Sequence, residues 1–405
     1  MTPHTVVLLR AIGGPSPTVS ATEMVLRDHD TGLGAGVAAL LEGSGWVRAV
    51  DADAPVPVAE SCIEVTLSPL PDIDGVFIEG PWGDDTVPAF THVVADRLLT
   101  RLTRSQLDRP VRECRIHAAA VADDGGTAAL LLGHSGSGKS TLAAHLVHGG
   151  LDLLNDEQIT VHRSAGSVGA FTRPVAIKAG GSEHLPPDVA GLVPDADRAW
   201  LLPVGDLNAD ARHRLTAQPV VSVVLGRDHV LAEPGQAVAH PGSVRVEPIP
   251  PVEAFSMLCA HSLDLVRKPA DALADLAWLA ATVPTVRLVY EDADVASTTV
   301  RELLADPPPV PAVDWEVSSP SGAAAAHDEP TDAAIVAAPG TVLVELGGEA
   351  FVFEPVERRL VSLTSEAVTL WKALPWVGDV SPELRTFAGA LEAVGVVRVV
   401  GDSGS

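Results

Sequence analysis

The segment GHSGSGKST, at residues 133–141, constrains the fold of this chain more than any other feature. It follows the continuous apolar run TAALLL and precedes STLAAHLVHGG, in which apolar residues recur at helical spacing. Gly133, Gly136 and Gly138 allow the backbone to approach a ligand at points where side chains would block it. The sequence therefore predicts a buried strand, a glycine-rich loop and a helix in direct succession, as in a P-loop.

The strand before this loop is expected to have an antiparallel neighbour. RIHAAAV at 115–121 is typical of a strand, and ADDGGT at 122–127 is typical of a tight turn. Two strands joined by so short a turn must be antiparallel. The predicted fold class is therefore α/β with a mixed sheet, which differs from a plain doubly wound fold.

The loop predicts binding of a nucleoside triphosphate with magnesium. Backbone N–H groups and the N-terminus of the following helix attract phosphate oxygens. Lys139 can reach the β- and γ-phosphates, and the Ser140 hydroxyl can bind Mg²⁺. The expected ligands are ATP and Mg²⁺, and the alternative is a glycine-rich turn that binds nothing. The predicted nucleotide-binding residues are Gly133, His134, Ser135, Gly136, Ser137, Gly138, Lys139, Ser140 and Thr141.

Two adjacent acids follow the P-loop helix. Asp156 and Glu157 end the apolar strand LDLLN, which begins directly after the helix. In a strand–loop–helix–strand unit, this end of the strand lies on the P-loop side of the sheet. One acid can hold the metal, and the other can accept a proton from an attacking group. The alternative is that both are surface acids of an acidic protein.

Residues 116–160 resemble the catalytic domain of bacterial HPr kinase/phosphorylase and its relatives. That family has a His on a strand, a hairpin, a G-x-S-G-x-G-K-S loop, a helix and a strand ending in two acids, as seen here. The resemblance implies transfer of the ATP γ-phosphate to a Ser or Thr hydroxyl. It further implies catalytic roles for Lys139, for Asp156 as the base and for His117 as its helper, with Ser140, Glu157 and Asp156 at the metal. The family's second acid is usually Asp, so which acid is the base stays open.

A second segment, FTRPVAIK at 171–178, resembles a proline–lysine segment of divergent members of that family. The resemblance makes Arg173 and Lys178 candidate phosphate contacts, with ordinary surface basic residues as the alternative. The glycine- and arginine-rich signature of true HPr kinases is absent. HPr itself is therefore not the expected substrate.

The C-terminal part resembles the PqqD-like domain, which recognises leader peptides of ribosomally made precursors. LTSEAVTLW at 363–371 and LEAVGVV at 391–397 carry the resemblance, after three short strand patterns. It implies a small α+β, winged-helix-like domain that pairs with a peptide at a sheet edge, for which RLVSL at 359–363 is our candidate. The alternative is a generic winged-helix-like or dimerisation module. The candidate peptide contacts are Leu360, Val361, Phe387 and Leu391.

Four regions follow from these patterns. We expect an N-terminal α/β region of unknown role at 1–90, the P-loop domain at 91–305, a Pro/Ala/Ser linker at 306–335 and the PqqD-like domain at 336–405. Together the two resemblances imply a kinase for a precursor peptide that works beside other peptide-modifying enzymes. One alternative is an ATPase or nucleotide switch that delivers the peptide to a partner enzyme. The other is a scaffold that binds peptide without catalysis.

Charge and cysteine usage restrict the partners further. The formal net charge of −26 argues against nucleic acid and against an anionic membrane surface as partners. The three cysteines show no paired spacing, and no signal peptide or membrane span is visible, so a cytoplasmic protein is expected. A homo-oligomer remains open.

Overall fold

The structure is a computed structural model that divides into two compact units. The first comprises Met1–Val111, His117–Pro248 and Val286–Pro308, and the second comprises Arg112–Ile116, Ile249–Thr285 and Pro309–Ser405. We describe each unit by itself. The described residues are 5–11, 23–29, 31–43, 46–50, 63–70, 74–107, 112–194, 197–226, 244–319, 334–377 and 381–400.

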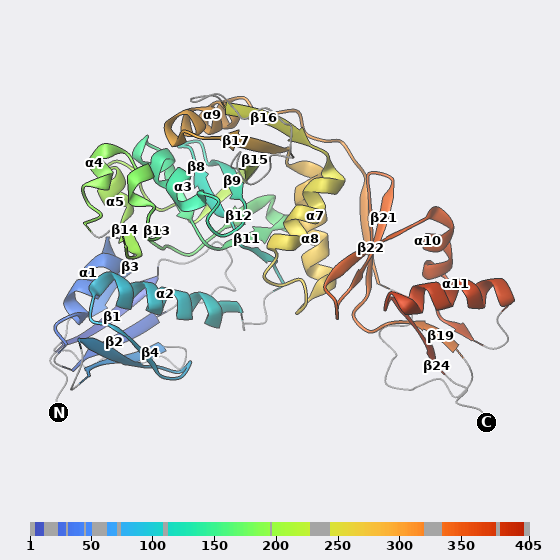
Figure 1. Cartoon of the computed structure of the whole chain (residues 1–405), viewed down its shortest axis with the longest axis horizontal. Helices are drawn as coiled ribbons and strands as arrows, with labels where there is room; N and C mark the ends of the chain where they lie inside the picture. The colour runs from blue at the N-terminus through green and yellow to red at the C-terminus, as the bar shows by residue number, and fades with distance from the viewer. Residues whose placement is uncertain are drawn as a thin grey trace. The chain divides into compact units, whose positions relative to one another are not determined.

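The first unit begins with a mixed sheet in the order β3-β1-β2-β4-β5-β6. Its only parallel pair within the described ranges is β2 with β4, and helices α1 and α2 pack together beside the sheet (Figure 1). The elements are β1 (Thr5–Ala11), β2 (Glu23–Asp28), α1 (Gly34–Glu42), β3 (Trp46–Val50), β4 (Ile63–Pro69), β5 (Gly75–Glu79), β6 (Asp85–Pro88) and α2 (Thr91–Leu107).

Apolar residues recur at helical spacing along helix α2. Val94, Ala95, Leu98, Leu99 and Leu102 are fully buried, because their spacing places them on one helical face. They pack with Leu26, Leu67 and Ile78 of the sheet in one core. This packing fixes α2 as a rigid support for the polar residues on its other faces.

The second sheet of this unit has the order β10-β8-β9-β15-β12-β11, with β17 also pairing with β15 and β16. Pairs β8–β9 and β10–β8 are antiparallel, whereas β15–β9 is parallel. The predicted antiparallel neighbour of the loop strand is thus confirmed, and the sheet is mixed. The strands are β8 (Ala119–Ala122), β9 (Thr127–Leu132), β10 (Asp152–Asn155), β11 (Ile159–His162), β12 (Ser167–Gly169), β15 (Thr216–Gly226), β16 (Val244–Ile249) and β17 (Thr285–Tyr290).

This strand order brings the predicted site to one edge of the sheet. β10 is antiparallel to β8, and β8 is antiparallel to β9, so β9 and β10 run in the same direction. The ends of β9 and β10 and the start of β8 therefore meet at the same edge. Gly133 directly follows β9, Asp156 directly follows β10, and His117 lies two residues before β8.

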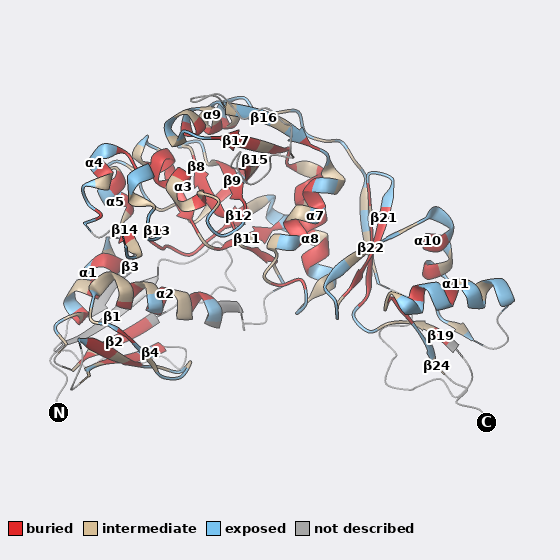
Figure 2. Cartoon of the chain, in the orientation of Figure 1, coloured by how far each residue is buried: buried red, intermediate tan, exposed pale blue. Residues whose placement is uncertain are grey.

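Helix α3 (Lys139–His148) connects β9 to β10 and covers this sheet. Leu142, Leu146 and Val147 are buried against it, and α9 (Ala293–Ala305) packs against α3. Figure 2 shows how completely β8, β9 and α3 are buried. The remaining elements of the unit are the 3₁₀ turns Arg163–Ala165 and Ser182–His184, the antiparallel pair β13 (Val175–Ile177) and β14 (Trp200–Leu202), and the short helices α4 (Pro187–Ala190) and α5 (Val204–Leu207).

His213, a half-buried histidine whose two ring nitrogens are shielded from solvent, predicts acid sensitivity of this unit. His213 bridges to Leu153 of β10, and neither of its ring nitrogens has a hydrogen-bond partner in the described parts of the chain. Burial lowers the pKa of His213 to about 4. Because the unfolded chain takes up the proton near pH 6.5, stability should fall as the pH drops from about 6.5 towards 4, by about 2 kcal/mol between pH 7 and pH 5.

The His213→Leu variant should lack this loss, since leucine takes up no proton. Urea unfolding of both proteins at pH 7 and pH 5 measures the difference. His184→Leu, at a half-exposed histidine, is the control and should retain the loss. An equal acid loss in wild type and His213→Leu would contradict the prediction.

The second unit contains a sheet in the order β18-β20-β21-β22 and a smaller one in the order β23-β19-β24. Helix α8 packs against β18 and β20, α10 against β22, and α11 against β24. The buried Arg115–Asp264 ion pair, 2.7 Å between Nη2 and Oδ1, ties the segment before His117 to the α7–α8 turn. The elements are β7 (Arg115–Ile116), α7 (Pro251–His261), α8 (Pro269–Thr282), β18 (Trp315–Ser318), β19 (Ala334–Ala337), β20 (Val342–Leu346), β21 (Glu349–Glu354), β22 (Arg359–Leu363), α10 (Ser365–Lys372), β23 (Trp376–Val377), α11 (Pro382–Ala393) and β24 (Val397–Val400).

The unit boundaries differ from the regions expected from sequence. Helices α7 and α8, expected in the P-loop domain, lie in the second unit with the C-terminal sheet. Residues Trp315–Ser318 of the predicted linker 306–335 form strand β18, because they pair with β20. Residues 320–333 of that linker lie outside the described residues. None of the helices within the described ranges is long and apolar enough to cross a membrane.

Candidate functional site

The glycine-rich loop joins β9 to α3 with backbone angles that favour glycine. At Gly133, with φ of 153°, a Cβ atom would lie 2.5 Å from the Ser137 hydroxyl oxygen. Gly138 has φ of 94° and occupies the N-cap position of α3, where no side chain accepts a capping hydrogen bond. The first N–H groups of α3 therefore face the pocket without a side-chain cap, and this arrangement suits an anionic ligand.

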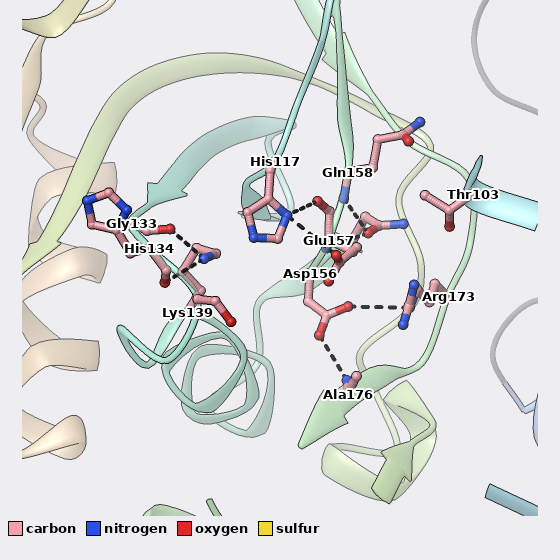
Figure 3. Close-up of polar contacts among 12 residues, drawn as sticks. Thr103, His117, Gly133, His134, Lys139, Asp156, Glu157, Gln158, Arg173 and Ala176 are labelled. Carbon is pink, nitrogen blue, oxygen red and sulfur yellow. Dashed lines mark hydrogen bonds and ion pairs between the residues drawn. The ribbon is translucent and has the colours of Figure 1, made fainter. Parts of the chain in front are cut away.

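Lys139 lies under this loop rather than in solvent. Its ammonium donates hydrogen bonds to the carbonyl oxygens of Gly133, at 2.6 Å, and His134, at 3.1 Å (Figure 3). Burial lowers the pKa of Lys139, and the negative charge of Glu157 opposes this shift. The charge is thus held at the centre of the loop.

Asn155 shapes the turn that carries the two acids. Its buried side-chain oxygen accepts hydrogen bonds from the N–H groups of Glu157, at 2.7 Å, and Gln158, at 3.0 Å. Its side-chain nitrogen donates to the carbonyl oxygen of Phe171, at 2.8 Å. The end of β10 is thereby locked to the segment that leads to Arg173, and the backbone of the acid pair has one orientation.

Asp156 is almost completely buried, with 1% of its surface exposed. Oδ2 accepts a hydrogen bond from the Ala176 N–H at 2.8 Å, and Oδ1 lies 3.9 Å from Nε of Arg173. Burial raises the pKa of Asp156, and Arg173, the Ala176 N–H and the Ser140 hydroxyl oppose the rise. The carboxylate is therefore fixed in place beside the start of α3.

Glu157 differs from Asp156 in exposure and in partner. Its side chain is 42% exposed, and Oε1 lies 3.5 Å from Nδ1 of His117. The same nitrogen lies 3.0 Å from the carbonyl oxygen of Glu157. Burial lowers the pKa of His117, and Glu157 opposes this. The structure thus places His117 against Glu157, whereas the family resemblance made it the helper of Asp156.

The two candidate phosphate contacts lie in different surroundings. Lys178, which is largely exposed, donates a 2.6 Å hydrogen bond to the Ser135 hydroxyl and so reaches across the loop. Arg173 is buried, and its Nη2 donates to Oδ1 of Asp96 on α2, at 3.0 Å. Lys178 is therefore placed to meet a ligand on the loop, whereas Arg173 lies behind Asp156.

Most of these groups line one pocket of about 200 Å³. Its oxygen donors, Ser140, Asp156 and Glu157, are the kind that Mg²⁺ prefers. No group of three His, Cys, Asp or Glu side chains forms a metal cluster in the described ranges. This composition fits Mg²⁺ held by one or two carboxylates together with substrate phosphates. The pocket is lined by His117, Ser135, Gly136, Gly138, Lys139, Ser140, Thr141, Asp156, Glu157, Ala176, Ile177, Lys178, Ala179, Gly180, Gly181 and His184.

The candidate peptide contacts lie in the second unit. Leu391 is buried in the core formed by β19, β20, β21 and helices α10 and α11, and Val361 and Phe387 pack against this core. Leu360 is half-buried on β22. β22 is the last strand of its sheet, as expected for a peptide-pairing edge, and the helix that packs on it is α10.

Two residues of the site were missed by the sequence analysis. Asn155 directly precedes the acid pair, and an Asn at a strand end is a common turn former, so this signal was available. Asp96 gave no signal, because its partner Arg173 is 77 residues away in sequence.

No protein-family model matches this chain, and none of the curated proteins matches it either. Among solved structures, the HPr(Ser) kinase/phosphatase from Coxiella burnetii is similar over 46% of this chain and 94% of that chain, with 14% sequence identity and a TM-score of 0.24. A TM-score this low does not establish a shared fold.

Proposed function

We propose that this protein is an ATP-dependent phosphotransferase that phosphorylates a Ser or Thr hydroxyl of a ribosomally made precursor peptide. The carrying observation is the convergence of Lys139, Ser140, the acid pair and His117 on one pocket beside an uncapped helix N-terminus. A cationic group, loop amides and two carboxylates are the groups that phosphoryl transfer requires. A glycine-rich turn without ligand would not need a buried lysine beneath it.

Each group has a distinct task in this proposal. Loop N–H groups and Lys139 bind the phosphates and balance their charge, and Lys178 contacts the outer side of the γ-phosphate. Ser140 and Glu157 hold Mg²⁺, which when bound would neutralise the phosphate oxygens. Asp156 accepts the proton of the attacking hydroxyl. We assign this task to Asp156 because a fixed carboxylate orients an acceptor better than an exposed one.

The test is transfer of label from γ-labelled ATP. Peptides encoded beside the gene for this protein are incubated with enzyme, ATP and Mg²⁺, and phosphorylated Ser or Thr residues are located by mass spectrometry. A single added phosphate on a peptide supports the proposal. Release of inorganic phosphate without peptide labelling would indicate an ATPase, and neither product would indicate a scaffold.

We further propose that the second unit recruits the leader part of the peptide at β22. An edge strand offers unpaired backbone groups, and an extended peptide can add to them as a further strand. β22 ends its sheet, and α10 beside it is anchored in the core of the unit through Val368 and Trp371. Backbone pairing would provide affinity, and half-buried Leu360 would contact leader side chains.

Hydrogen exchange should report this pairing directly. A leader peptide at saturating concentration should slow amide exchange within residues 359–363 by about tenfold or more, because outward-facing N–H groups gain partners. Exchange in β18, at the opposite end of the same sheet, should stay unchanged and serves as the internal control. Protection at β18 alone, or in the first unit alone, would remove β22 as the recognition edge.

A further inference from the structure

Arg173 lies buried between two acids that come from separate parts of the first unit. Its Nη2 donates a 3.0 Å hydrogen bond to Oδ1 of Asp96, and its Nε lies 3.9 Å from Oδ1 of Asp156. Only 3% of Arg173 is exposed. One guanidinium group therefore faces a carboxylate on α2 and the carboxylate of the pocket (Figure 3 shows the Asp156 side).

The two contacts are unequal. The distance to Asp96 is that of a hydrogen bond, whereas 3.9 Å is too long for one. Nε of Arg173 and Oδ1 of Asp156 are both buried, and neither has a hydrogen-bond partner among the described residues. Buried opposite charges attract strongly and would close such a gap if they were free to move. Another contact must therefore keep the Arg173 guanidinium at this distance from Asp156.

Asp96 is placed to do this. Its neighbours Val94, Ala95 and Leu98 are fully buried, so the helix that carries Asp96 cannot shift easily. A 3.0 Å contact to a rigid helix fixes one edge of the guanidinium and with it the position of Nε. The Asp96 side chain is half-buried; burial raises its pKa, and the charge of Arg173 opposes the rise.

We infer that Asp96 is a positioning residue of the proposed transfer reaction. It holds Arg173 back from Oδ1 of Asp156, and the Asp156 carboxylate thereby keeps its place in the pocket. Without Asp96, Arg173 would close on Asp156 and occupy that oxygen. The inference rests on the proposed function, and it gives helix α2 a role at the site.

The experiment measures phosphate release from MgATP, with water as acceptor, and binding of a fluorescent MgATP analogue. Asp96→Ala should lower turnover about tenfold at saturating MgATP while analogue binding stays within about twofold. In an Arg173→Ala background, Asp96→Ala should have no further effect, because the group that it restrains is gone. Asp96→Asn should restore most of the turnover, since its amide oxygen still accepts from Nη2.

Asp85→Ala is the matched control. Asp85 also pairs with an arginine of α2, Arg101 at 3.0 Å, but it lies outside the pocket. This variant should turn over as the wild type does. An equal loss in Asp85→Ala and Asp96→Ala would show that only the stability of α2 matters and would overturn the inference.

The remaining outcomes separate the inference from the proposed function. No phosphate release and no peptide labelling by the wild type would defeat the proposed function itself. An active wild type with full turnover in Asp96→Ala would defeat only the inference. So would a loss in Asp96→Ala that persists undiminished in the Arg173→Ala background.

Discussion

Lys139→Met should remove most of the phosphoryl-transfer activity. Methionine keeps an unbranched apolar stem of similar length but removes the charge that lies under the loop, where Lys139 is 6% exposed. In the proposed function, ATP phosphates would replace the carbonyl oxygens of Gly133 and His134 as partners of the ammonium. The loss should be about 10²- to 10³-fold in turnover, the usual cost of removing one transition-state charge contact.

Lys372→Met is the control for Lys139→Met. Lys372 lies in the second unit and pairs with Glu345, so the substitution removes a lysine charge without touching the pocket. Turnover by this variant should equal that of the wild type, measured as labelled phosphate transferred per enzyme. Wild-type turnover by Lys139→Met would contradict the assignment of the loop.

Local patterns predicted the part of the fold that holds the loop. The run TAALLL, the turn before it and the glycines after it all lie within 20 residues of one another, so their geometry follows from short-range sterics. The bounds of α2 were predictable for the same reason, since one apolar face decides them. The caps Thr364 and Ser381 also act locally: their side chains accept hydrogen bonds from the N–H groups of Ala367 and Leu384.

Long-range partners were not predictable from such patterns. β18 looks like part of a Pro/Ala segment until β20, about 30 residues later, supplies its hydrogen-bond partners. The contact between Asp96 and Arg173 depends on how α2 packs beside the segment after β12. The same limit applies to the partner of His117. The sequence predicted His117 on a strand, whereas it lies between β7 and β8, and the choice between two adjacent acids depends on the turn that Asn155 fixes.

Substitution of Asp156 in the acid pair should have the second large effect on phosphoryl transfer. Asp156→Asn should lose at least about 10²-fold in transfer, because an amide cannot accept the acceptor's proton. ATP binding should stay nearly intact, since asparagine can keep the contacts of Asp156 with the Ala176 N–H and the Ser140 hydroxyl and removes no positive charge from the loop. The asparagine oxygen can still accept the Ala176 bond, so the fold around it should persist. Single-turnover transfer and equilibrium nucleotide binding, measured on the same preparation, separate the two effects.

Glu157→Gln is the contrast that decides the division of roles. It has the same charge change one residue away, on a side chain that is 42% exposed and paired with His117. This variant should need a higher Mg²⁺ concentration for half-maximal transfer but recover much of its rate at saturating Mg²⁺, because a metal ligand is weakened and the base is retained. Suppose instead that Asp156→Asn recovers at high Mg²⁺ and Glu157→Gln does not. Asp156 would then hold the metal beside Ser140, and Glu157 with His117 would accept the proton.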